Sequence, residues 1–157
     1  MSYSIPKDIF VKAAKEYGTP LWIYNRETIE ERVKETKVFD VVRYAQKACS
    51  NLSVLALMKR LGVVVDAVSA GEIVRALKAG YKGGIEKGKA PEIVYTADIF
   101  DADALELVKQ HKIPVNIGSP DMIEQLAAAG IRTDLTLRVN PGFGHGHSSK
   151  VNTSGEL

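Results

Sequence analysis

The chain has 157 residues, of which 45% are hydrophobic and 25% charged, a composition typical of a globular protein rather than a collagen-like or disordered chain. No apolar run approaches the ~18 residues needed to cross a membrane, and the N-terminus lacks the apolar core of a signal peptide, so we expect a cytoplasmic protein. The net charge is +2 and no block of basic residues stands out, which argues against nucleic acid or an acidic membrane surface as a partner. Cys49 is the single cysteine, so a disulfide within the chain and a cysteine-rich zinc site are excluded.

The chain divides, by its pattern, into an N-terminal segment over residues 1–38 and a main domain over residues 39–157. The N-terminal segment contains a short extended stretch, Leu21–Tyr24, and a charged helix from about Glu27 to Lys37. In the main domain, two kinds of segment alternate, one rich in valine and isoleucine and one with helical spacing.

Five short apolar runs predict five β-strands in the main domain. Near-continuous apolar runs of this length are typical of strands in a buried parallel sheet. The runs are Phe39–Tyr44, Val63–Val68, Ile93–Thr96, Ile113–Ile117 and Leu135–Val139.

The segments between these runs have the apolar spacing of helices. Residues suited to a helix N-cap precede them, and glycines suited to a helix C-terminus follow three of them. The N-cap candidates are Ser50 or Asn51, Ser69, Asp101 and Ser119, and the glycines are Gly62, Gly80 and Gly130. Strand and helix thus alternate four times before a fifth strand, and such repeated units predict a parallel sheet.

Two parallel α/β folds fit this order of elements. One is a five-stranded doubly wound sheet, and the other is an arc of an eight-stranded βα barrel, whose usual length is ~250 residues. Periodicity does not choose between them. Residues 140–157 contain four glycines and no further apolar segment, so no helix is expected to cover the fifth strand. This favours an incomplete barrel of about four βα units and a fifth strand.

Polar residues follow the predicted strands, at the edge where both parallel folds carry their sites. They are Gln46, Lys47, Asp66, Ser69, Thr96, Asp98, Asn116, Ser119, Arg138 and Asn140. Such a polar rim on an apolar body is typical of a small-molecule site. Lys47 stands out because a partly desolvated lysine amine can be a nucleophile toward an aldehyde. The alternative is a lysine that simply emerges into solvent.

Two further charged residues interrupt apolar strands. Asp66 needs a partner, and Lys47 on the neighbouring strand is the natural candidate, although a purely structural hydrogen bond fits equally. Arg138 could clamp an anion or a cofactor, or it could be paired structurally. The tail histidines His145 and His147 lack further metal ligands, so no metal site is expected there.

The motifs carry a family resemblance. Residues 44–51 (YAQKACSN), 63–72 (VVVDAVSAGE), 137–142 (LRVNPG) and 145–153 (HGHSSKVNT) resemble the barrel-type pyridoxal-phosphate decarboxylases, and within them the branch that decarboxylates diaminopimelate. Residues 17–25 (YGTPLWIYN) are also similar to that branch. Three ordered motifs at the ends of strands one, two and five are together specific.

The resemblance implies a pyridoxal-phosphate-binding barrel of the alanine racemase type and a separate C-terminal β-domain. Lys47 matches the lysine that carries the cofactor, Asp66 the acidic residue near it, and Arg138 an arginine of the cofactor pocket. The implied reaction is decarboxylation of meso-2,6-diaminopimelate to L-lysine and carbon dioxide. The full-length enzyme is expected to be a cytoplasmic homodimer with an amino-acid substrate.

The sequence also departs from this family. Members are roughly two and a half times longer, so the β-domain and much of the substrate site are expected to lie outside these 157 residues. We therefore expect the chain alone to be inactive and prone to associate through open sheet edges. The alternatives are a relative acting on another basic amino acid, a racemase, a non-catalytic fragment that binds a partner through its sheet edges, and an independent binding module without cofactor.

Overall fold

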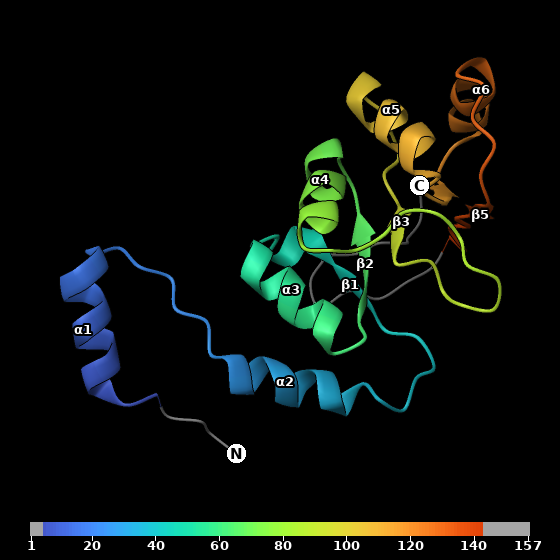
Figure 1. Cartoon of the computed structure of the whole chain (residues 1–157). Helices are drawn as coiled ribbons and strands as arrows, with labels where there is room; N and C mark the ends of the chain where they lie inside the picture. The colour runs from blue at the N-terminus through green and yellow to red at the C-terminus, as the bar shows by residue number, and fades with distance from the viewer. Residues whose placement is uncertain (1–4, 143–157) are drawn as a thin grey trace. The chain divides into compact units, whose positions relative to one another are not determined.

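The computed structural model describes residues 5–142 and divides the chain into two compact units, Met1–Val42 and Arg43–Leu157 (Figure 1). Over the described residues, no helix is both long and apolar enough to cross a membrane. The tail with His145, His147 and the motif of residues 145–153 lies outside the described part of the chain.

The first unit contains two helices, α1 (Lys7–Tyr17) and α2 (Arg26–Glu35). The charged helix is confirmed, and it begins where the Asn25 side chain accepts a hydrogen bond of 2.8 Å from the Thr28 N–H. Helix α1 was not predicted. Leu21–Tyr24 forms no strand, because no neighbouring strand in the described part of the chain offers it hydrogen bonds.

The second unit contains one parallel sheet. Its strands are shorter than the apolar runs that predicted them, but each lies within or across its run. They are β1 (Arg43–Ala45), β2 (Val64–Ala67), β3 (Ile93–Tyr95), β4 (Val115–Ile117) and β5 (Leu135–Leu137). All pairings are parallel, and the strands lie side by side in chain order.

A helix follows each of the first four strands, as predicted. The helices are α3 (Leu52–Arg60), α4 (Ala70–Lys78), α5 (Ala102–His111) and α6 (Pro120–Ala128). Their N-caps are Asn51, Ser69, Asp101 and Ser119, all among the predicted residues, and the Ser119 side chain makes no capping bond. Helix α4 begins with a capping box in which the Glu72 carboxylate accepts from the Val68 N–H and the Ser69 hydroxyl oxygen accepts from the Glu72 N–H.

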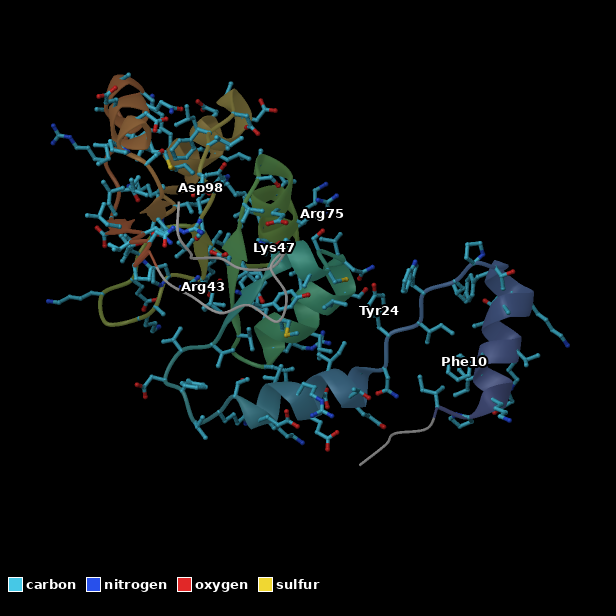
Figure 2. All side chains as sticks on the ribbon, turned by 180° about the vertical axis from the view of Figure 1, so that it is seen from behind. Phe10, Tyr24, Arg43, Lys47, Arg75 and Asp98 are labelled. Atoms are coloured by element: carbon cyan, nitrogen blue, oxygen red, sulfur yellow. The ribbon has the colours of Figure 1, made fainter. Side chains whose placement is uncertain are left out.

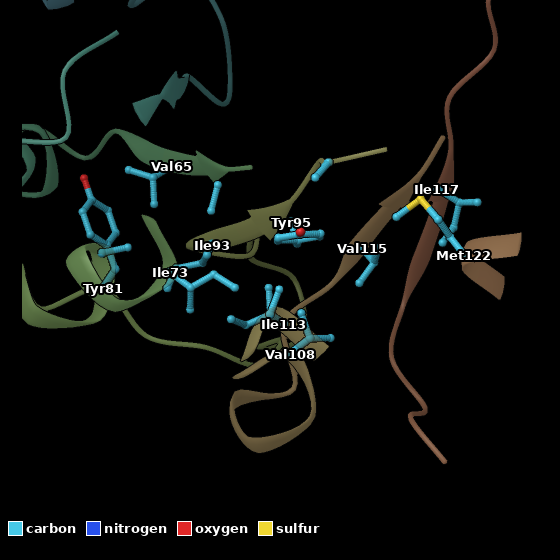
Figure 3. Packing of buried hydrophobic residues seen from close by; sticks show 14 of the residues in the cluster. Val65, Ile73, Tyr81, Ile93, Tyr95, Val108, Ile113, Val115, Ile117 and Met122 are labelled. Carbon is cyan, nitrogen blue, oxygen red and sulfur yellow. The ribbon is translucent and has the colours of Figure 1, made fainter. Parts of the chain in front are cut away.

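The two faces of the sheet differ in chemistry. Residues alternate in burial along β2, β3 and β4, so one face of each strand enters the core and the other does not. The core face carries Val65, Ala67, Ile93, Tyr95, Val115 and Ile117, which pack with buried residues of all four helices in one cluster (Figure 3). The helices therefore cover a single face of the sheet.

Strand order and helix placement decide between the two candidate folds. A doubly wound sheet has a strand order that reverses and helices on both faces. Here the order is sequential and the helices lie on one face, which is the arrangement of a βα barrel over part of its circumference. The prediction of an incomplete barrel is confirmed, and β5 is exposed along its length.

Candidate functional site

Lys47 lies on a short 3₁₀ turn, Gln46–Ala48, which leaves the carboxyl end of β1. The turn places the lysine at the edge that all the parallel strands share (Figure 2). Its side chain is exposed, so the expectation of a partly desolvated amine is wrong for this structure. The reason is that β1 is an edge strand, with a neighbouring strand on one side only.

Gln46, directly before Lys47, is buried in the same turn. It is 1% exposed, and within residues 5–142 neither its amide nitrogen nor its amide oxygen has a hydrogen-bond partner. A buried amide left unpaired is costly. This edge of the sheet therefore carries polar groups that a bound ligand could satisfy, beside an accessible amine.

Asp66 lies on β2, level with Ala45 of β1. Its Oδ1 atom accepts a hydrogen bond of 2.5 Å from the Thr96 hydroxyl, which follows β3. Asp66 thus makes the structural hydrogen bond that was the alternative expectation, and the expected pairing of Asp66 with Lys47 is wrong in this structure. The register explains the difference, because Lys47 lies two residues beyond the level of Asp66 and on an exposed turn.

Arg43, at the amino end of β1, was missed as a contributor to this face. Its guanidinium donates to the carbonyls of Val65 at 2.8 Å and Pro91 at 3.0 Å. Burial lowers the pKa of Arg43, and the nearby Asp66 carboxylate acts in the opposite direction. A charged residue inside an apolar run, the same signal that marked Asp66, could have found it.

The face of the sheet opposite the helices is hollowed. A groove of about 500 Å³ runs across it, and its lining mixes charged, polar and apolar groups. The lining residues are Arg43, Ala45, Asp66, Pro91, Val94, Thr96, Pro114, Asn116, Asp134 and Thr136. Asp66 and Thr96 thus face a cavity large enough for a small ligand.

Arg138 follows β5 at the same carboxyl edge. Its Nη1 group donates to both carboxylate oxygens of Asp98, at 3.2 and 3.3 Å. Asp98 follows β3, so this ion pair passes the end of β4, where Gly118 lies. A Cβ atom on Gly118 would overlap the Asp98 carboxylate, so a larger residue at this position would displace the carboxylate from its present place.

The structure brings the polar ends of the strands together in two pairs. Asp66 is joined to Thr96, and Arg138 is joined to Asp98. Thr96 and Asp98 were recognisable from the sequence as polar residues after a strand, but nothing in the sequence indicated their partners. Over residues 5–142, Lys47 makes no hydrogen bond or ion pair with either pair.

Comparison with known proteins identifies relatives over most of the chain. The family model "Pyridoxal-dependent decarboxylase, pyridoxal binding domain" matches residues 26–157. A diaminopimelate decarboxylase of Streptomyces coelicolor is 54% identical over 144 residues, covering 92% of this chain and 32% of that protein. One from Escherichia coli strain K12 is 52% identical over 141 residues, covering 90% of this chain and 33% of that protein.

Solved structures agree in fold. A crystal structure of a diaminopimelate decarboxylase matches with a TM-score of 0.84 at 49% identity, covering 95% of this chain and 35% of that one. The enzyme from Helicobacter pylori, complexed with L-lysine, matches with a TM-score of 0.71 at 30% identity, covering 85% of this chain and 34% of that one. The chain spans about a third of the length of the curated relatives it matches.

Proposed function

The chain belongs to the pyridoxal-dependent decarboxylase family, and we propose that it is the cofactor-binding part of an enzyme that converts meso-2,6-diaminopimelate to L-lysine and carbon dioxide. The identity of 54% to a diaminopimelate decarboxylase over 92% of the chain is the observation that carries this proposal. Because the chain spans about a third of such relatives, the activity is proposed for the whole protein. As part of the same proposal, the whole enzyme is a cytoplasmic homodimer.

The residues at the carboxyl edge fit pyridoxal phosphate in their chemistry. The cofactor has an aldehyde, an anionic phosphate and a pyridine nitrogen. Lys47 offers an accessible amine for the aldehyde, Arg138 a guanidinium for an anionic group, and Asp66 a carboxylate that faces the groove. The buried, unpaired amide of Gln46 supplies further donor and acceptor capacity beside the lysine.

Each of these residues then has a role that follows from its chemistry. Lys47 would hold the cofactor at its aldehyde, because its amine is an accessible nucleophile. Asp66, held by Thr96, would present its carboxylate to the bound cofactor from the groove. When bound, pyridoxal phosphate supplies an electron sink for the electron pair left behind by the departing carboxylate.

Borohydride trapping tests the assignment of Lys47. A chimera in which this chain replaces the matching residues of the Escherichia coli enzyme is incubated with pyridoxal phosphate, reduced, digested and mapped by mass spectrometry. We expect the label on Lys47 at concentrations that leave the exposed Lys89 unlabelled, and loss of this label in Lys47→Arg. Lys89→Arg is the matched control and leaves labelling of Lys47 unchanged. Label spread evenly over the surface lysines contradicts the assignment.

A chimera tests the substrate. The matching residues of the Escherichia coli enzyme, which is 52% identical over 141 residues, are replaced by those of this chain. Release of carbon dioxide is measured with meso-diaminopimelate, ornithine, arginine and lysine. We expect release from diaminopimelate that Lys47→Ala abolishes. A folded chimera that binds the cofactor and does not decarboxylate diaminopimelate contradicts the proposed function.

A further inference from the structure

The end of strand β3 contacts both charged residues of the candidate site. The Thr96 hydroxyl donates to Asp66, and the Asp98 carboxylate accepts from Arg138. Asp66 belongs to the strand on one side of β3, and Arg138 follows the strand beyond the neighbour on its other side. Residues 96–98 therefore link charged groups that arise from different parts of the sheet.

The backbone around these two residues is held firmly. The Thr96 N–H donates to the Ala67 carbonyl at 2.8 Å, which keeps β3 paired with β2 up to its last residue. Beyond Thr96, the Tyr95 hydroxyl donates to the Ile99 carbonyl at 2.8 Å, and the Tyr95 ring stacks on Phe100 at 5.0 Å between centroids. Tyr95 is 1% exposed, so a core residue anchors the loop that carries Asp98.

The residue beside Asp98 also leaves room for its contact with Arg138. Gly118 leaves room for the carboxylate, since any Cβ atom there would overlap Asp98 Oδ1 at 2.2 Å. Asp98 accepts hydrogen bonds from the Nη1 group of Arg138. A guanidinium has five N–H donors, and over residues 5–142 the Nη2 and Nε groups have no other partner, so they could donate to an anion while Asp98 limits how the side chain can rotate.

We propose that Thr96 and Asp98 are positioning residues, which orient Asp66 and Arg138 respectively for the bound cofactor, and that Gly118 is the glycine that makes the Asp98 contact possible. This inference rests on the proposed function. It assigns no contact between Thr96 or Asp98 and the cofactor itself. Its consequence is that shape-conserving changes at these positions weaken cofactor binding without unfolding the sheet.

The test uses the Escherichia coli chimera described above and measures its dissociation constant for pyridoxal phosphate by absorbance, and the urea midpoint of each variant by circular dichroism. Thr96→Val removes the hydroxyl and is expected to weaken binding about tenfold, since hydrogen bonds to charged groups are among the stronger ones, whereas Thr96→Ser restores it. Asp98→Asn is expected to weaken binding about threefold, because the ion pair is half exposed.

Gly118→Ala supplies an independent way to displace the same carboxylate. We expect it to match Asp98→Asn, and the double variant to bind no more weakly than either single variant, because both act through one contact. Thr133→Val is the matched control. It removes a threonine hydroxyl that donates to the Ile113 carbonyl, away from the carboxyl edge, and it leaves the affinity unchanged.

The outcomes separate the two levels of proposal. The positioning roles alone are overturned if the unsubstituted chimera binds the cofactor on Lys47 and its Thr96→Val, Asp98→Asn and Gly118→Ala variants bind equally well. A folded, unsubstituted chimera that does not bind the cofactor overturns the proposed function and this inference with it. The inference is also overturned if the variants that bind the cofactor more weakly have correspondingly lower urea midpoints and Thr96→Ser does not restore binding. These residues would then have a structural role only.

Discussion

A substitution at Tyr81 tests how the core stabilises the fold, because the Tyr81 hydroxyl is buried and hydrogen-bonded. The side chain is 3% exposed, and Oη donates toward the carbonyls of Val63 at 2.9 Å and Leu55 at 3.2 Å. Tyr81→Phe keeps the ring and deletes this donor. We expect the free energy of unfolding at pH 7 to fall by about 1–2 kcal/mol, which is the net value of one hydrogen bond plus part of the cost of leaving a buried carbonyl unpaired. This corresponds to a Tm lower by about 3–8 °C.

The same residue makes stability depend on alkaline pH. Burial is the main cause that raises the pKa of Tyr81 above 10, and the nearby Glu92 carboxylate adds to it. Burial, with a smaller effect of the Asp101 carboxylate, raises the pKa of Tyr95 to about 12. For both groups the folded state binds its proton more tightly than the unfolded state. Their contribution is complete below pH 10 and is lost as pH rises toward the folded values, at about 1.4 kcal/mol per pH unit for each tyrosine.

Two measurements check this reasoning. Urea midpoints between pH 7 and 11.5 are expected to fall above pH 10, and the fall is half as steep in Tyr81→Phe. Absorbance at 295 nm is expected to show that Tyr81 and Tyr95 ionise above pH 10, and the contribution of Tyr81 is missing in the variant. Tyr17→Phe, at a side chain 71% exposed, is the control and changes stability by less than ~0.5 kcal/mol. Six tyrosines that all ionise together near pH 10 would refute the argument.

Two further changes test local packing and capping. Asp101→Ala removes the carboxylate that accepts from the Ala104 N–H at 2.6 Å, and we expect a loss of about 1 kcal/mol. Ser119→Ala is the matched control with a much smaller effect, because its side chain makes no capping bond, and equal urea midpoints for the two variants would contradict this. Met122→Ala creates a cavity at a fully buried side chain and is expected to cost about 2–5 kcal/mol in chemical denaturation. Ile123→Ala, next to it and 44% exposed, is expected to cost less than ~1 kcal/mol, and a larger loss there would contradict the assigned core face.

The elements of the sheet unit could be predicted because their signals are local. Valine-rich runs mark the strands, and Asn51, Ser69 and Asp101 mark helix starts because a side-chain oxygen pairs with an N–H within three residues. Helix α1 carried similar signals, with Asp8 in its first turn and Gly18 at its end. It was missed although its apolar residues are spaced as in an amphipathic helix, and none of its side chains is buried.

The contacts of the site could not be predicted in the same way. Asp66 and Thr96 are 30 residues apart, and Asp98 and Arg138 are 40 apart, so each contact depends on the register of strands rather than on nearby sequence. A shift of one residue in either pairing would move the side chains to the opposite face. The expected partnership of Lys47 with Asp66 was wrong because Lys47 lies two residues beyond the level of Asp66, on an exposed turn.

Side chains along each strand alternate between the core face and the groove face of the sheet. The apolar runs therefore predicted the parallel sheet correctly but wrongly predicted that both of its faces are buried. Reading Val65-Asp66-Ala67 as nearly continuous apolar sequence predicted a parallel sheet buried on both faces. In the structure, Val65 and Ala67 enter the core while Asp66 faces the groove. A polar residue at every second position of a parallel strand is therefore the signal to follow, because a buried charge persists only with a partner. Applied to Arg43 and Asp66, that rule places both on the groove face from sequence alone, and it identifies the face on which a ligand would bind.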